Sequence, residues 1–211
     1  MSAENTTPPT CIRNATLLDP AEGSCRAGDL WLADGRIIPP GTAGGAMQVV
    51  DASGLTLTPG LIDLHVHLRE PGNEEAETIE SGCRAAARGG FTTLVSMPNT
   101  FPAPDNGPAI LDLLRRATGA SCRVLPSGCI TRERRGLAVA DLEGMHAAGA
   151  TAFTDDGATV ADERIMETAM ERAARLHVAV MDHALDAILA GRGAMHEGDA
   201  SRRAGIPGIP S

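Results

Sequence analysis

Two histidines near the end of a predicted strand are the residues best suited to bind a metal ion. His65 and His67 lie at the end of residues 61–68, whose alternating side chains predict a β-strand. Because alternate side chains of a strand point to the same face, both imidazoles share one face with Arg69. Imidazole is the commonest protein ligand for metals, so the pair presets part of a coordination shell. A solvated polar face on an edge strand is the competing interpretation, and the H-x-H pattern alone leaves it open.

Further candidate ligands follow later predicted strands. Asp155 and Asp156 come directly after a predicted strand at residues 151–154, and His183 follows another predicted strand at residues 177–182. Acidic pairs at such junctions are often helix caps or turn formers, and a lone histidine is more often an ordinary polar residue. Their position favours ligation, because the carboxyl ends of parallel strands converge on one point if the sheet closes into a barrel.

Arg69 and Asn99 are candidates for binding a carboxylate of the substrate. A guanidinium pairs with a carboxylate through two charge-assisted hydrogen bonds, and an amide adds another. A metal centre beside such a pair indicates an acid substrate that contains a hydrolysable bond. The competing interpretations are an ion pair of Arg69 with Glu70 or Glu74, and a turn role for Asn99 beside Pro98.

Strands alternate with helices after residue 58, which predicts βαβ units and a parallel sheet. The predicted strands are residues 61–68, 91–97, 123–130, 151–154 and 177–182, and the predicted helices are residues 74–88, 107–117, 141–148 and 162–176. An open doubly wound sheet and a (β/α)8 barrel both fit this order. A dinucleotide-binding fold loses its best support, because no G-x-G-x-x-G follows the first of these strands.

The chain is expected to divide into a small β subdomain, residues 1–58, and a barrel part, residues 59–211. Short strands flank the Asp34–Gly35 pair, which signals a hairpin because both residues tolerate positive φ. Residues 48–51 and 55–58 are predicted to be further short strands.

The composition indicates a globular cytoplasmic protein. Hydrophobic residues make up 43% of the 211 residues, and 27 acidic against 18 basic residues give a net charge of −9. This balance disfavours nucleic acids and anionic membranes as partners, since both reward clustered positive charge. Residues 1–10 lack the basic and apolar parts of a signal peptide, and no apolar run approaches the roughly 20 residues of a membrane-spanning helix. The five scattered cysteines are expected to be free thiols in a reducing compartment.

Four segments resemble the dihydroorotases of class I type in the metal-dependent amidohydrolase superfamily. They are residues 59–72 (PGLIDLHVHLREPG), 97–100 (MPNT), 153–157 (FTDDG) and 205–210 (GIPGIP). The resemblance covers nearly all of residues 15–211. It implies about the first five strands of a (β/α)8 TIM-type barrel, with a Zn²⁺ centre that usually holds two ions. The implied reaction is the reversible cyclisation of N-carbamoyl-L-aspartate to dihydroorotate in pyrimidine biosynthesis.

The resemblance also implies roles for the candidate ligands. His65 and His67 match ligands of the more buried metal, and His183 matches a ligand of the second. Asp156 matches the bridging carboxylate, a position that some relatives fill with a carboxylated lysine. Asp156 is preferred to Asp155 because the family places this ligand 27 residues before the next histidine ligand, as Asp156 precedes His183.

The resemblance assigns the substrate carboxylate to Arg69 and Asn99, but the sequence departs from the family in two respects. The general-base aspartate, which follows the eighth strand in the family, has no counterpart here. Ala184 and Leu185 stand where relatives often have Cys-Glu. We therefore expect the chain to be about half of a longer enzyme and to be inactive alone.

Two other functions remain open at this point. An allantoinase or a dihydropyrimidinase is disfavoured by the pair Arg69 and Asn99, which indicates an acid substrate. An inactive homologue that binds aspartate transcarbamoylase is disfavoured because all four expected ligands are present. The expected partners are a small-molecule substrate and either further copies of the chain or aspartate transcarbamoylase.

Overall fold

The computed structural model describes residues 8–42 and 44–210, which form two compact units, Met1–Gly60 and Leu61–Ser211. Each unit is described by itself. Most of residues 1–10, for which we predict no signal peptide, lies outside the described residues. None of the helices in the described part of the chain is long and apolar enough to cross a membrane.

The first unit is a small β-sheet. Its strands are β1 (Thr10–Asp19), β2 (Ser24–Ala33), β3 (Arg36–Ile38), β4 (Gln48–Asp51) and β5 (Thr56–Leu57). β2 pairs antiparallel with β1 and β3, whereas β4 and β5 pair in parallel with β1. The β2–β3 hairpin turns at Asp34 and Gly35, whose φ angles of +50° and +70° suit a two-residue hairpin turn. The predicted hairpin is therefore confirmed.

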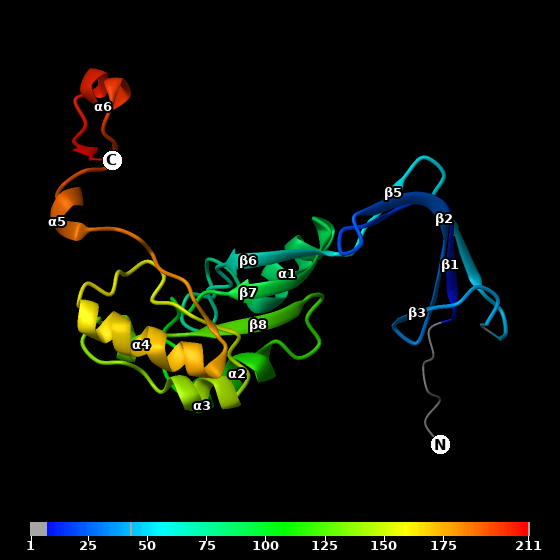
Figure 1. Ribbon diagram of the computed structural model, residues 1–211, viewed down its shortest axis with the longest axis horizontal. Coiled ribbons are helices and arrows are strands. Elements are labelled where there is room, and N and C mark those ends of the chain that lie inside the picture. Colours follow the sequence, from blue (N-terminus) through cyan, green and yellow to red (C-terminus); the bar gives the residue numbers. More distant parts are fainter. Residues whose placement is uncertain (1–7, 43, 211) are drawn as a thin grey trace. The chain divides into compact units, whose positions relative to one another are not determined.

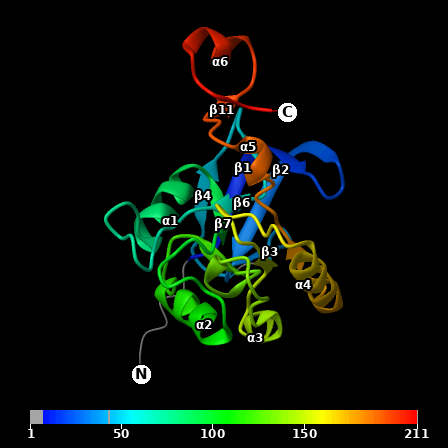
Figure 2. The same cartoon turned by 90° about the vertical axis from the view of Figure 1, so that its left-hand side faces the viewer.

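The second unit contains a curled, five-stranded parallel sheet, which is a half-barrel (Figures 1 and 2). Its strands are β6 (Leu61–Val66), β7 (Phe91–Ser96), β8 (Arg123–Gly128), β9 (Ala152–Phe153) and β10 (Ala179–Val180). They lie side by side in the order of the sequence, with β6 and β10 at the two edges. The predicted fold class, a partial barrel preceded by a small β subdomain, is confirmed. The division of the structure falls after Gly60, and the predicted domain boundary at Thr58 stays a prediction.

Four helices follow the first four strands of this sheet and lie in an arc along its outer side (Figure 2). They are α1 (Ile79–Arg88), α2 (Gly107–Arg116), α3 (Leu142–Ala147) and α4 (Glu163–Leu176). Side chains cap the start of each helix by accepting hydrogen bonds from its first turn, and the capping residues are Thr78, Asn106, Asp141 and Asp162. The residues after β10 form α5 (Ala187–Ala190), β11 (Met195–His196), α6 (Asp199–Ala204) and β12 (Gly208–Ile209).

The largest apolar cluster packs the helices α2 to α4 against the sheet. Ile110, Leu142, Met145 and Phe153 are each completely buried in it. Burying a side chain of this size contributes about 1.5–3 kcal/mol to stability. The cluster also includes Cys129 and Ile130, so it anchors β9 and the residues that directly follow β8.

The first helix of the second unit is shorter than predicted. It begins at Ile79 rather than at residue 74, because Thr78 accepts a hydrogen bond from the Ser81 N–H and the Ser81 hydroxyl accepts one from the Thr78 N–H. The predicted start of this helix at residue 74 is therefore wrong. Glu74 lies in the preceding loop, where its carboxylate accepts a hydrogen bond from the Gly72 N–H at 3.0 Å.

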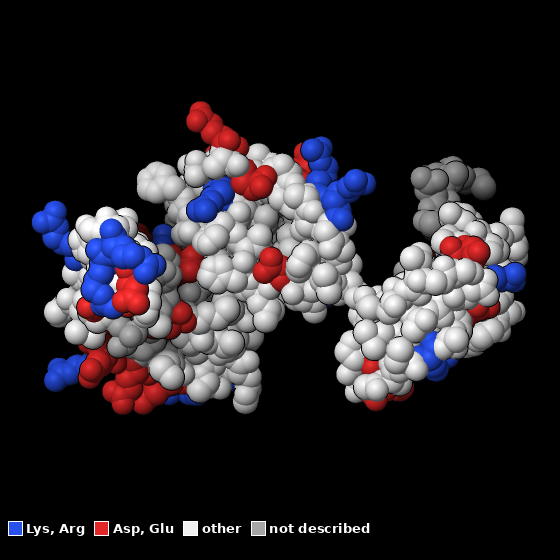
Figure 3. Space-filling model, turned by 90° about the horizontal axis from the view of Figure 1, so that it is seen from above, with Lys and Arg blue, Asp and Glu red and all other residues white. Residues whose placement is uncertain are grey.

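Charged side chains of both signs are interspersed on the face of the molecule that Figure 3 shows. In the view of Figure 3, basic and acidic residues lie next to one another on the visible face. All 18 basic residues of these 211 are arginines, since the sequence contains no lysine.

Candidate metal centre

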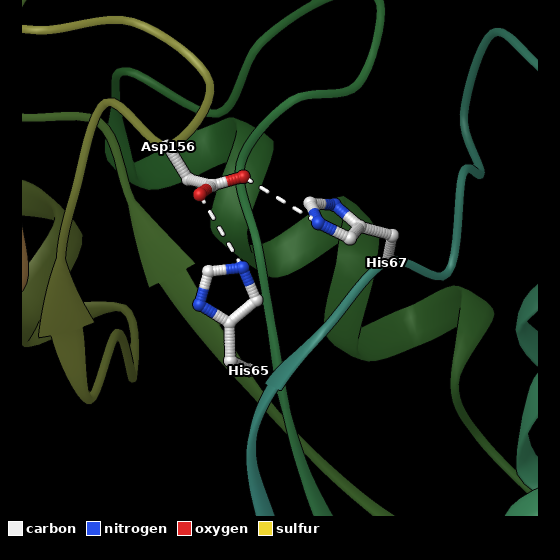
Figure 4. A group of neighbouring side chains, drawn as sticks. All are labelled: His65, His67 and Asp156. Carbon is white, nitrogen blue, oxygen red and sulfur yellow. Dashed lines mark ion pairs between the residues drawn. The ribbon is translucent and has the colours of Figure 1, made fainter. Parts of the chain in front are cut away.

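Three of the predicted ligands meet at the carboxyl ends of the strands. The His65 Nε2 atom lies 3.3 Å from one carboxylate oxygen of Asp156, and the His67 Nε2 atom lies 3.5 Å from the other (Figure 4). The two imidazole rings are 5.2 Å apart between centroids and meet edge to face at 72°. Ligand atoms of all three residues lie within 4.8 Å of one another. Two imidazoles and one carboxylate so arranged suit a zinc-type cation.

The curvature of the sheet brings these residues together. His65 belongs to β6, His67 follows its last residue, and Asp156 follows β9. In a flat sheet, strands three places apart would be separated by about 14 Å. Because the sheet curls, side chains from its edge strand and its fourth strand reach one point. The curvature of the half-barrel therefore brings the residues of this site together.

Asn99 fixes the orientation of the His67 ring. Its side-chain oxygen lies 2.9 Å from the His67 Nδ1 atom. With Oδ1 as acceptor, the proton of the neutral ring lies on Nδ1, so the lone pair on Nε2 faces Asp156 and is free for a cation. The Asn99 amide nitrogen remains able to donate to an anion, which is compatible with the predicted role in substrate binding.

The two neighbouring aspartates have different environments. The Asp156 side chain, 7% exposed, faces the two histidines. Asp155 is 2% exposed and accepts hydrogen bonds from the Ile130 N–H at 2.8 Å, the Thr131 N–H at 3.1 Å and the Thr131 hydroxyl. Burial raises the pKa of the Asp155 carboxyl above its ordinary value, and the hydrogen bonds oppose this shift. The geometry supports Asp156, rather than Asp155, as the ligand.

Arg69 follows His67 by two residues, beyond the end of β6 at Val66, in a left-handed backbone conformation with a φ of +62°. The strand alternation that predicted a shared face with the two histidines therefore does not extend to Arg69. Its two competing ion-pair partners are engaged elsewhere. Glu70 pairs with Arg116 at 3.0 Å, and Glu74 accepts from Gly72. Arg69 has no ion pair within residues 8–42 and 44–210, so its guanidinium is available to an anionic ligand.

His183 is not part of the three-residue group found among the described residues. It lies after β10 and is exposed. Its backbone carbonyl accepts a hydrogen bond from the Thr159 hydroxyl at 2.7 Å, which ties this segment to the loop before α4. Its role as a ligand stays a prediction.

Sequence reasoning missed two residues that contact the aspartate pair. They are Thr131, which donates to Asp155, and Arg134, whose guanidinium donates to the backbone carbonyls of Asp155 and Asp156. Both lie in the loop after β8, within the run TRERR, and nothing in this run distinguishes a buried polar network from a solvated basic loop.

The curled parallel sheet and the His-His-Asp group at its carboxyl ends define the class of this protein as a parallel α/β half-barrel with a candidate metal centre. The chain belongs to the dihydroorotase family, since the family model described as "Dihydro-orotase-like" matches residues 54–211. Amidohydrolase relatives are generally metal-dependent, which agrees with the ligand set. The bridging position cannot be a carboxylated lysine in these 211 residues, because they contain no lysine.

Curated relatives are similar over most of the chain. It is 44% identical over 206 residues to a dihydroorotase of Solibacter usitatus, covering 96% of this chain and 48% of the relative. It is 48% identical over 187 residues to a dihydroorotase of Shouchella clausii, covering 88% and 44%. The chain therefore spans about half the length of the curated relatives it matches.

Solved structures share the fold at lower sequence identity. An L-hydantoinase from Arthrobacter aurescens is 21% identical with a TM-score of 0.72, over 85% of this chain and 41% of that one. A D-hydantoinase from a Thermus species is 25% identical with a TM-score of 0.66, over 87% and 42%. A dihydroorotase structure is 14% identical with a TM-score of 0.58, over 85% and 52%.

Proposed function

We propose that this chain supplies the metal-binding and carboxylate-binding residues of a dihydroorotase, which interconverts N-carbamoyl-L-aspartate and dihydroorotate. The observation that carries the proposal is the convergence of His65, His67 and Asp156, with Asn99 bonded to one of the histidines. Curated relatives with the name dihydroorotase, at 44% and 48% identity, support this substrate.

The proposed cofactor is zinc, with two ions per site. His65, His67 and Asp156 would hold the first ion, and Asp156 and His183 would contribute to the second. Bound zinc acts as a Lewis acid toward an amide carbonyl and lowers the pKa of water at the site. The ligand set of two imidazoles and a buried carboxylate supports zinc over magnesium, which prefers oxygen ligands.

Two residues are proposed to bind the substrate through its carboxylate. Arg69, which has no ion pair among the described residues, offers a planar guanidinium. Asn99 uses its side-chain oxygen on His67 and offers its amide N–H groups to the same anion. A cyclic amide without a carboxylate leaves this pair unused, so the pair selects acid substrates.

The isolated chain is proposed to bind metal without catalysing turnover, because the general-base aspartate of the family has no counterpart in these residues. Such a base must collect a proton from water and deliver it to the leaving nitrogen. Turnover of dihydroorotate by the purified 211-residue chain would contradict this part of the proposal.

The test of the function uses the protein encoded by the whole gene, assayed with dihydroorotate and with hydantoin. We expect metal-dependent turnover of dihydroorotate by the wild-type protein. Arg69→Ala and Asn99→Ala should each raise the KM for dihydroorotate, so that turnover is lost. The hydantoinase folds that the chain resembles provide the second candidate, a hydantoinase or dihydropyrimidinase. Turnover of hydantoin without turnover of dihydroorotate would replace the first proposal by the second.

The proposed location is the cytoplasm, supported by five cysteines that are all free in the structure. The proposed macromolecular partner is a further copy of the chain or aspartate transcarbamoylase. Exposed apolar side chains on the edge strand β6 support association, since Ile62 is 59% and Leu64 65% exposed. Light scattering of the chain, alone and with aspartate transcarbamoylase, tests this; a monomer in both samples would contradict it.

A further inference from the structure

Asp155 joins the end of β9 to the loop after β8. One of its carboxylate oxygens accepts from the backbone N–H groups of Ile130 and Thr131, at 2.8 Å and 3.1 Å, and the other accepts from the Thr131 hydroxyl. Thr131 is completely buried and Asp155 is 2% exposed. Because every one of these contacts is buried, Asp155 is held in one rotamer and fixes the main chain next to Asp156.

Arg134 holds the same segment from a second direction. Its Nη2 atom donates to the Asp155 carbonyl at 3.3 Å and to the Asp156 carbonyl. The guanidinium also lies close to Gly157, where an added Cβ would be 3.3 Å from Nη2. The backbone of Asp156 is thus held at its carbonyl, while its N–H donates to the Thr154 hydroxyl at 3.1 Å.

The loop that presents Arg134 has an unusual backbone that its contacts stabilise. Glu133 and Arg134 have φ angles of +52° and +57°, in the left-handed region that residues other than glycine seldom adopt. Thr131 holds this turn through its carbonyl, which accepts from the Arg134 N–H at 3.0 Å, and its hydroxyl, which accepts from the Gly136 N–H at 2.9 Å. The Arg134 Nε atom is nevertheless buried without a partner among the described residues. Backbone strain like that at Glu133 and Arg134 persists where the surrounding structure determines the conformation.

We propose that Asp155, Thr131 and Arg134 are positioning residues, which hold the Asp156 carboxylate between His65 and His67 in the geometry that a metal ion needs. The inference rests on the proposed metal centre. Thr131 links the other two residues, because its hydroxyl donates to Asp155 and accepts from the Gly136 N–H in the turn that carries Arg134. Partners behind a metal ligand commonly alter metal affinity by about 10- to 100-fold when they are removed.

The test titrates Co²⁺ into the 211-residue chain, because the visible absorption of Co²⁺ depends on the number and geometry of its ligands. Thr131→Val removes the hydroxyl and keeps the shape of the side chain. We expect binding about 10- to 100-fold weaker and a changed visible spectrum. Thr131→Ser keeps the hydroxyl and is expected to restore the wild-type affinity and spectrum.

The matched control is Thr168→Val on α4, where the hydroxyl donates to the Arg164 carbonyl at 2.7 Å, inside a helix. We expect wild-type Co²⁺ binding from this variant. Arg134→Met provides a second test if Thr131→Val folds poorly, and far-UV circular dichroism verifies the fold of each variant.

The outcomes separate the positioning role from the metal centre. Wild-type affinity and spectrum in natively folded Thr131→Val and Arg134→Met would overturn the positioning role and leave the metal centre standing. Equal losses in Thr131→Val and Thr168→Val would also overturn it, because general destabilisation would then explain both. A wild-type chain that binds no Co²⁺ would overturn the metal centre, and the positioning role with it.

Discussion

The two ring nitrogens of His67 have different partners, and this division determines what the residue can do. Nδ1 faces Asn99 at 2.9 Å, and Nε2 faces Asp156 at 3.5 Å. A histidine that donates through one nitrogen presents a lone pair at the other, so the ring is prepared for a cation before one binds. His65 has no such second contact among the described side chains, and its side chain is 54% exposed.

Asn99→Ala is expected to weaken zinc binding by about tenfold, because Nδ1 of His67 loses the acceptor that fixes its tautomer. Competition with a chromophoric chelator measures the affinity. The control Asn106→Ala removes the side-chain cap of α2, where Asn106 accepts from the Ala109 N–H at 3.1 Å. It should cost about 1 kcal/mol of stability and leave zinc affinity unchanged. Equal affinity in the two variants would contradict the assigned role of Asn99.

Among single residues, the positional rule for parallel strands selects four candidate ligands, and the structure brings three of them together, without His183. His65, His67 and Asp156 each stand at the end of an apolar strand, where ligands gather in parallel sheets. Thr131 and Arg134 act through contacts that cross from the loop after one strand to the residues after the next. Arg134 itself lies in a left-handed turn with Glu133, for which the sequence contains no glycine signal.

At the scale of elements, the order of strands and helices follows directly from the sequence, and their ends follow less well. Apolar runs and helix caps such as Asp162 predict where most elements lie. The loop between β6 and α1 differs from the prediction because it depends on distant partners. Glu70 in this loop binds Arg116 of α2, 46 residues away, and accepts from the Ile79 N–H at 3.0 Å. Periodicity within a short window does not contain this information.

Gly72→Ala is expected to disturb the two loops that carry Arg69 and Asn99. Gly72 has a φ of +99°, and a Cβ there would overlap with the Phe101 carbonyl oxygen and side chain. We expect a loss of about 1–3 kcal/mol in the free energy of unfolding, measured by urea denaturation. Gly23→Ala is the control, since Gly23 also has a positive φ, +61°, but has open space around it. Equal losses in the two variants would show that the overlap at Phe101 is unimportant.

The ion pair between Glu143 and Arg172 joins α3 to α4 and should make stability depend on pH. Arg172 Nε donates to Glu143 at 2.9 Å, and this hydrogen bonding lowers the pKa of Glu143 to about 2. A lowered pKa means that the pair stabilises the fold above the ordinary value of 4.5 and that the contribution is lost as the pH falls toward 2. The Glu143 side chain is 52% exposed, so solvent screening limits the contribution to about 0.2–1 kcal/mol.

Glu143→Gln tests this dependence. The difference in unfolding free energy between wild type and variant should shrink as the pH is lowered from about 5 to about 3, because the Glu143 carboxylate becomes protonated in the unfolded state while the folded state keeps it ionised until the pH approaches 2. Urea denaturation at each pH gives the difference. A difference that is constant over this range would mean that the ion pair contributes nothing.

At the scale of the whole molecule, metal binding is expected to stabilise the second unit selectively, because all three ligands belong to residues 61–211. Zinc at 100 times its dissociation constant should add about 2.7 kcal/mol, since it binds the folded state and not the unfolded one. Differential scanning calorimetry with and without zinc measures the shift. His67→Ala is the control and should show none, and a shift of equal size in that variant would place the bound zinc elsewhere.

The separation of the ligands along the chain has a kinetic consequence. His65 and Asp156 come from the first and the fourth strand of the parallel sheet, so they meet only after the intervening β7 and β8 have paired. Contacts between residues so distant in sequence require loop closure and tend to form late in folding. Interactions absent from the transition state slow unfolding and leave the folding rate nearly unchanged. Bound metal is therefore expected to slow the unfolding of the curled sheet and to leave its rate of folding nearly unchanged.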